Sequence, residues 1–193
     1  MRRIGVFCGA TAGLDPGHAV AARAFGSSMA RRGVAIVTGG GRVGLMGAVA
    51  DATLAAGGSV VGVIPRSLVD RELAHPGLTG LIVVDTLAER KSAIIGMCDG
   101  FVALPGGIGT LDELAEVLSW AQLGLHAKPV GILEIGDYWA QFLAWLDAAV
   151  TQGYVTPAHR RAIVVASDAD ALLDAFARFT PPGNRWDDGV GAG

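Results

Sequence analysis

Short apolar runs rich in valine and isoleucine alternate along this chain with longer segments in which apolar residues recur every three or four positions. The short runs are bounded by glycine, proline or aspartate, which is typical of buried parallel strands. The longer segments often end at glycine, as helices do. The predicted strands span residues 4–7, 34–38, 59–64, 81–84, 101–104, 129–133 and 162–165. The predicted helices span residues 16–32, 43–56, 87–98, 110–123, 138–152 and 168–179.

This alternation of strands and helices predicts a doubly wound α/β fold. We expect a Rossmann-like parallel sheet of about seven strands with helices on both faces, in a single nucleotide-binding domain over residues 1–179. Residues 180–193 carry Pro181, Pro182 and four glycines, so this tail is predicted to be disordered. No uncharged apolar run reaches the roughly 20 residues that a membrane helix needs. We therefore expect a cytoplasmic protein without a membrane partner.

The most specific motif is Pro-Gly-Gly-Ile-Gly-Thr-Leu-Asp-Glu at residues 105–113, between a predicted strand and a predicted helix. Glycines at the end of a strand let the backbone curl, so that several N–H groups and a helix N-terminus point at one anion. A carboxylate follows one turn later. The motif therefore indicates an enzyme that anchors a nucleotide by its phosphate. The alternative is a capping box, in which Thr110 caps the helix and Glu113 reaches back to its amide.

A second glycine-rich loop, at residues 39–47, matches the dinucleotide-binding pattern G-x-G-x-x-G through Gly39, Gly41 and Gly44. Two features argue against a dinucleotide. The loop follows the second predicted strand, and the next strand ends without the acid that would hold a ribose hydroxyl. The chain also lacks the Gly-Lys-Ser/Thr of a P-loop. The alternative to ligand binding is that these glycines only let a helix pack closely on the sheet.

Composition and charge limit the kinds of partner that the protein is expected to bind. Of the 193 residues, 51% are hydrophobic and 17% charged, and the mean hydropathy is +0.46, so part of the apolar surplus is expected to cover a homodimer interface. The net charge is −3 without a long basic run, which argues against nucleic acid. Cys8 and Cys98 lie far apart in sequence, and no metal site or disulfide is expected. The expected dimer contact is the apolar stripe of helices 87–98 and 110–123: Ile94, Ile95, Leu114, Val117 and Leu118.

These motifs resemble the LOG family, the cytokinin riboside 5′-monophosphate phosphoribohydrolases, whose older label is "lysine decarboxylase". The family pattern P-G-G-x-G-T-x-x-E is met at residues 105–113, and G-G-G-x-x-G-L-M-G at residues 39–47. The resemblance extends from residue 6 to about residue 131 and includes Arg90-Lys91. It implies a Rossmann-like homodimer that needs no cofactor. It also implies hydrolysis of the N-glycosidic bond of a nucleoside 5′-monophosphate, such as AMP or an N6-modified relative, to free base and ribose 5-phosphate.

Carried over by position, the resemblance implies that Arg90 and Glu113 are catalytic. Breaking an N-glycosidic bond builds positive charge on the ribose, which a carboxylate can stabilise while it directs water. The planar fork of Arg90 can hold that carboxylate or the ribose hydroxyls. For Arg90 and Lys91 the alternative is a solvated helix face. The residues expected to bind substrate or phosphate are Glu72, Lys91, Gly106, Gly107, Ile108, Gly109, Thr110, Leu111, Asp112, Ser119, Gly9, Gly40, Gly41 and Gly44.

One departure from the family pattern concerns the base. Leu87 and Ala88 stand where Met and His are usual in M-H-x-R-K, which leaves open a preference for a hydrophobic N6 substituent or for plain AMP. Trp120 is expected to be a core or dimer residue. An alternative function is a non-catalytic carrier of a nucleotide or of the molybdenum cofactor, which needs the phosphate loop but not the acid. A true lysine decarboxylase would need pyridoxal phosphate on a lysine, and the chain has two lysines.

Overall fold

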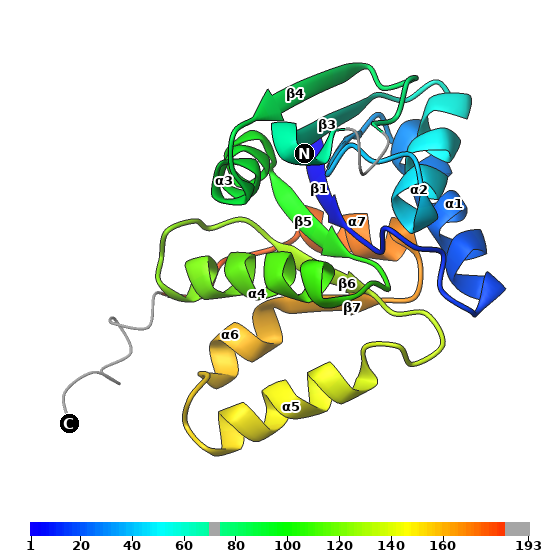
Figure 1. Ribbon diagram of the computed structural model, residues 1–193. Coiled ribbons are helices and arrows are strands. Elements are labelled where there is room, and N and C mark those ends of the chain that lie inside the picture. Colours follow the sequence, from blue (N-terminus) through cyan, green and yellow to red (C-terminus); the bar gives the residue numbers. More distant parts are fainter. Residues whose placement is uncertain (70–73, 184–193) are drawn as a thin grey trace.

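The computed structural model describes residues 1–69 and 74–183. Its seven strands form one parallel sheet in the order β4-β3-β2-β1-β5-β6-β7 (Figure 1). The predicted doubly wound parallel sheet is confirmed. Glu72 and residues 184–193, most of the predicted disordered tail, lie outside the described residues. The strands are β1 (Arg3–Phe7), β2 (Ala35–Thr38), β3 (Val60–Pro65), β4 (Gly80–Val84), β5 (Gly100–Ala103), β6 (Val130–Leu133) and β7 (Ile163–Ala166).

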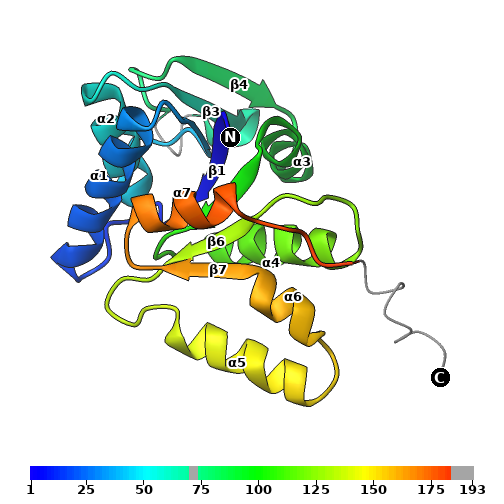
Figure 2. The same ribbon diagram turned by 180° about the vertical axis from the view of Figure 1, so that it is seen from behind.

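Helices cover both faces of the sheet (Figures 1 and 2). One face is covered by α1 (Pro16–Arg31), α2 (Gly44–Ala55) and α7 (Ala169–Ala177), and the other by α3 (Leu87–Met97), α4 (Ile108–Gln122) and α5 (Ala140–Thr151). All six correspond to predicted helices. The short α6 (Pro157–Ala162) and the 3₁₀ turn η1 (Arg66–Leu68) were not predicted, since neither is long enough to show a periodic pattern. No helix in residues 1–69 or 74–183 is long and apolar enough to cross a membrane.

Two apolar layers hold the helices to the sheet. On β1, Ile4 and Val6 join the layer under α1, α2 and α7, and Phe7 joins the layer under α3, α4 and α5. The expected dimer stripe lies in this second layer. Ile94 and Leu114 are at most 1% exposed, because a parallel sheet has to be covered on both faces. Ile94, Ile95, Leu114 and Val117 are therefore core residues, and their assignment to a dimer interface was wrong, whereas Leu118 is partly buried and pairing of the two helices stays a prediction.

The strand order places a crevice next to β1. Chain connections run outward from β1 toward β4 on one side and from β5 toward β7 on the other, so the loops after β1 and β5 diverge at the carboxyl ends of these strands. Two hydrogen bonds join the loops below the crevice. The Leu104 N–H donates to the Phe7 carbonyl over 2.9 Å, and the Gly9 N–H donates to the Pro105 carbonyl over 3.0 Å. Helices α2, α3 and α4 all begin at this edge.

Candidate active site

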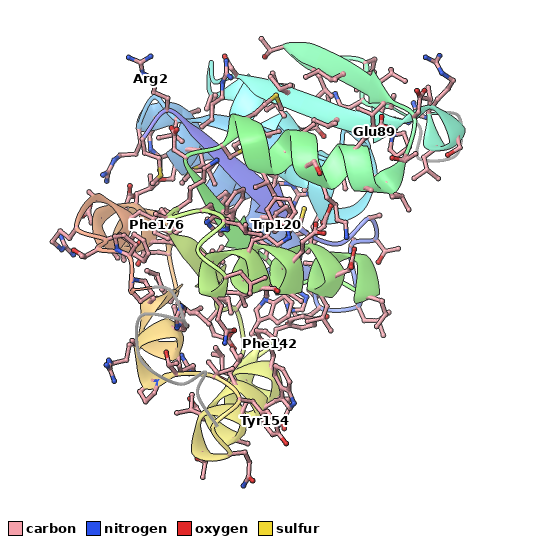
Figure 3. The ribbon with its side chains drawn as sticks, turned by 90° about the vertical axis from the view of Figure 1, so that its left-hand side faces the viewer. Arg2, Glu89, Trp120, Phe142, Tyr154 and Phe176 are labelled. Atoms are coloured by element: carbon pink, nitrogen blue, oxygen red, sulfur yellow. The ribbon has the colours of Figure 1, made fainter. Side chains whose placement is uncertain are left out.

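A cavity of about 840 Å³ opens at this edge and extends between α3 and α4. Figure 3 shows Trp120 between these two helices. Trp120 was expected to be a core or dimer residue. It packs against the core and also lines the cavity. The polar wall consists of Arg90, Lys91, Asp112, Glu113 and Glu116. The loop after β1 contributes Cys8, Gly9, Ala10 and Thr11, and the apolar side chains of the lining are Met46, Leu68, Leu87, Ala88 and Trp120.

Arg90 and Glu113 face each other across this cavity. The Arg90 Nη2 atom lies 3.8 Å from the Glu113 Oε1 atom, and their side chains are 9% and 16% exposed. Arg90 is held near the start of α3, whose first turn is capped by the Thr86 hydroxyl accepting from the Glu89 N–H over 3.1 Å. A guanidinium buried to this degree is not part of a solvated helix face, so that alternative is wrong for Arg90.

The room for the Arg90 guanidinium comes from the second glycine loop. A Cβ atom at Gly39 would lie 1.8 Å from the Arg90 Nη2 atom and 2.8 Å from its Cζ atom. Any side chain at position 39 would therefore occupy the place of the guanidinium. Sequence reasoning included Gly39 in the dinucleotide pattern but missed this contact, because 51 positions of sequence separate the two residues.

The other glycines of that loop lie behind the cavity. The Gly40 carbonyl accepts from the His75 N–H over 2.9 Å, and Gly41 pairs with Ala74. A Cβ atom at Gly44 would lie 2.4 Å from the Ala10 backbone, so this glycine lets α2 approach the loop after β1. Close packing therefore accounts for Gly44. Gly40, Gly41 and Gly44 are not among the residues that line the cavity, and their contact with substrate stays a prediction.

The predicted phosphate loop starts α4 directly. The helix begins at Ile108, and Gly107 is its N-cap without a capping side chain. The first N–H groups of a helix have no partner within the helix, and with the helix dipole they attract an anion. Gly107, Gly109 and Thr110 line the cavity at this point. Thr110 is the third residue of α4 and 3% exposed, so it does not cap the helix, and the capping-box alternative is wrong.

The remaining predicted site residues are more scattered. Gly106, Ile108 and Leu111 line a neighbouring groove between α4 and α5, and Gly107 lines both that groove and the cavity. Ser119 is exposed and is not among the residues that line the cavity. The described part of the chain therefore brings Gly9, Arg90, Lys91, Gly107, Gly109, Thr110, Asp112 and Glu113 together.

Lys91 ties α3 to α4. Its Nζ atom lies 3.1 Å from the Asp112 Oδ2 atom and 3.2 Å from the Glu116 Oε1 atom. Desolvation lowers the pKa of Lys91, but hydrogen bonds to Asp112 and Glu116 outweigh it, so the pKa of Lys91 is raised and the ammonium keeps its charge. Sequence reasoning missed Glu116. Its position one turn after Glu113, on the same helix face, could have indicated it.

Cys8 contributes a thiol to the cavity wall, and this thiol stays protonated. Burial, and then the nearby Glu113 carboxylate, raise the pKa of the Cys8 thiol well above its ordinary range. A thiol that stays protonated at neutral pH is a poor nucleophile. In residues 1–69 and 74–183 no three His, Cys, Asp or Glu side chains are grouped so as to hold a metal ion.

Comparison with known proteins agrees with these observations. A family model described as "Possible lysine decarboxylase" matches residues 46–176. The chain belongs to the LOG family. It is 45% identical over 181 residues to a rice protein named probable cytokinin riboside 5′-monophosphate phosphoribohydrolase LOGL5, covering 94% of this chain and 74% of that one. It is 42% identical over 180 residues to the Arabidopsis thaliana cytokinin riboside 5′-monophosphate phosphoribohydrolase LOG7, covering 93% and 83%.

Solved structures share the fold of this LOG-family chain. The molybdenum cofactor binding protein of Rippkaea orientalis superposes with a TM-score of 0.69 at 22% identity, covering 92% of this chain and 96% of that one. The Moco carrier protein of Chlamydomonas reinhardtii gives a TM-score of 0.68 at 24% identity with the same coverage. At these identities the likeness is one of fold.

The Gly39–Arg90 contact gives a testable prediction. We expect Gly39→Ala to lower turnover of a nucleoside 5′-monophosphate by roughly a hundredfold, because the new methyl displaces the guanidinium. The fold should survive, since a side-chain end can move aside. Gly96→Ala is the matched control. Gly96 lies on α3 with Arg90, and a Cβ atom there would meet no other atom within 4 Å. Steady-state kinetics with urea unfolding of both variants test this, and full activity of Gly39→Ala would contradict it.

Proposed function

We propose that this protein hydrolyses the N-glycosidic bond of N6-modified adenosine 5′-monophosphates, giving free base and ribose 5-phosphate. The observation that carries the proposal is the buried Arg90–Glu113 pair, which shares one cavity with the open N-terminus of α4. The LOG-family relatives at 45% and 42% identity, which are named as phosphoribohydrolases, support it.

In the proposed reaction the phosphate binds the N–H groups at the start of α4, and the ribose lies beside the Arg90–Glu113 pair. The bond from the anomeric carbon to the base nitrogen breaks, and its electron pair leaves with the base. The Glu113 carboxylate stabilises the positive charge that develops on the ribose. A water molecule then adds its oxygen to the anomeric carbon and gives up a proton, and the base nitrogen gains one. Arg90 holds the carboxylate and the ribose in register.

We propose that apolar side chains of the cavity contact the base. Met46, Leu68 and Trp120 line the cavity with Leu87 and Ala88, the two positions that depart from the family pattern. Leu87 is 58% exposed and lines the cavity. An apolar wall gains free energy when it covers an apolar substituent, at about 25 cal/mol per Å². We therefore propose that a prenyl group on N6 is preferred over the bare amino group of AMP.

The alternatives fit these observations less well. A carrier protein needs a phosphate site but has no use for a buried arginine facing a glutamate. A pyridoxal-phosphate decarboxylase needs a lysine that is free to form a Schiff base. The Lys128 Nζ atom donates to the Ile95 carbonyl over 2.6 Å and lies 5.8 Å from the centre of the Phe101 ring. Lys91 is held by two carboxylates.

The substrate assignment is tested by comparing phosphorylated and unphosphorylated forms. We expect N6-isopentenyladenosine 5′-monophosphate to release free base faster than AMP, and adenosine to react at least about a hundredfold more slowly than AMP, because it lacks the anchoring phosphate. Chromatography of the free base, with kcat/KM for each compound, measures this. Equal values for adenosine and AMP would refute the phosphate anchor.

The role of Glu113 is tested by Glu113→Gln. The amide keeps the shape of the side chain but lacks the charge, so turnover should fall by roughly 10²–10³-fold while AMP still binds. Asp85→Asn is the matched control, since the Asp85 side chain is 79% exposed and does not line the cavity. Kinetics and thermal unfolding of both variants decide the matter. Near-normal turnover by Glu113→Gln would rule out its catalytic role.

We also propose a homodimer that works in the cytoplasm. The groove between α4 and α5 has a volume of about 680 Å³, and its rim carries Ile108 at 83% and Trp145 at 61% exposure. Large adjoining apolar side chains of this kind mark contact surfaces. The groove starts at the phosphate loop, so a second copy there would also cover the cavity. The buried Cys8 and Cys98 are unpaired, in keeping with a reducing compartment.

Light scattering tests the dimer. We expect Trp145→Asp to give a monomer with reduced activity, because a charge in the groove opposes burial. Val20→Asp is the control, since Val20 is 64% exposed on α1, over the opposite face of the sheet, and it should keep the mass and activity of the wild type. A wild-type monomer with full activity would overturn the proposal.

A further inference from the structure

The turn between β6 and α5 reaches across to the phosphate loop. Gly136 and Asp137 follow each other with φ angles of 58° and 59°, both in the left-handed region. This conformation is uncommon for a residue other than glycine. A hydrogen bond across the turn stabilises it, because the Trp139 N–H donates to the Glu134 carboxylate over 3.1 Å. The residue after this turn is Tyr138, and its hydroxyl donates a hydrogen bond to the Gly106 carbonyl.

This hydrogen bond holds the peptide plane between Gly106 and Gly107 from the side of α5. Gly106 and Gly107 both lack a side chain, and glycine backbones adopt many conformations. The peptide group between them is planar and trans, so the Gly106 C=O and the Gly107 N–H point in opposite directions. When the Tyr138 hydroxyl holds the carbonyl on one side, the Gly107 N–H is turned to the other. Gly107 lines both the cavity and the neighbouring groove, whereas Tyr138 lines the groove and is not among the residues that line the cavity.

We propose that Tyr138 is a positioning residue for the phosphate site. It acts through the Gly106 carbonyl and orients the peptide that enters α4. The proposal deepens the proposed function and rests on it, because it concerns the same phosphate loop. The loop is then held from two sides, by the Gly9 N–H on the Pro105 carbonyl and by Tyr138 on the Gly106 carbonyl.

The Tyr138 ring is held independently of its hydroxyl. It packs edge-on against His18, with ring centres 5.3 Å apart and an interplanar angle of 84°, and against Trp139 at 5.3 Å and 86°. Removing the hydroxyl therefore leaves these contacts in place. Tyr138→Phe isolates the hydrogen bond from the packing.

The test compares Tyr138→Phe with Tyr154→Phe. The chain has two tyrosines, and Tyr154 is 78% exposed beyond the end of α5, which makes it the matched control. Titration calorimetry uses ribose 5-phosphate, which is not consumed, and adenine, which carries no phosphate. We expect Tyr138→Phe to bind ribose 5-phosphate about tenfold more weakly, or about 1.4 kcal/mol, and adenine as the wild type does. The KM for AMP should rise more than kcat falls. Tyr154→Phe should match the wild type throughout.

Each outcome bears on a separate claim. Unchanged affinity of Tyr138→Phe for ribose 5-phosphate overturns the positioning role. Equal losses for ribose 5-phosphate and adenine, with a lower melting temperature, overturn it in favour of general stability. A wild type that binds no ribose 5-phosphate overturns it together with the phosphate site. Selective weakening in a protein whose wild type releases no base from any nucleotide supports the positioning role and refutes the proposed hydrolysis alone.

Discussion

Burial of the Arg90 guanidinium is the constraint on which the site depends. A buried arginine needs both space and an opposite charge, because an uncompensated charge in the interior is costly. The space comes from Gly39 at the end of β2, and the charge from Glu113 in the second turn of α4. Changes at either place would displace the same guanidinium. The two glycine-rich loops therefore serve one site in different ways: residues 39–47 make room for the guanidinium, and residues 105–113 present helix N–H groups.

The fold brings these parts together without long connections. The strand order reverses next to β1, so the loops after β1 and β5 part at the edge where α2, α3 and α4 begin. Each functional side chain lies within the first turns of its helix or directly after its strand. Lys91 then links α3 to α4 through Asp112 and Glu116, which fixes the width of the cavity between the two helices.

Much of this architecture could be predicted from the sequence, because strand and helix periods are local. The phosphate loop at residues 105–113 was predicted from its motif, and the roles of Arg90 and Glu113 were predicted from the family resemblance. Contacts between distant residues could not be predicted, since nothing near Gly39 or Tyr138 in the sequence names its partner. Thr110 was a plausible cap, but α4 begins two residues earlier, at Ile108. The apolar stripe through Ile94 and Leu114 covers the sheet. A helix face buried in the core and one buried in a dimer show the same apolar period, so the sequence could not distinguish them.

The central claim is that a nucleotide is anchored at the start of α4 and cleaved beside Glu113. A crystal structure of Glu113→Gln with bound AMP tests it most directly, because the substrate stays intact. The account predicts the phosphate within hydrogen-bonding distance of the N–H groups of residues 108–110, and the anomeric carbon next to residue 113. A phosphate bound instead at the loop of residues 39–47, with the ribose away from Arg90, would contradict it.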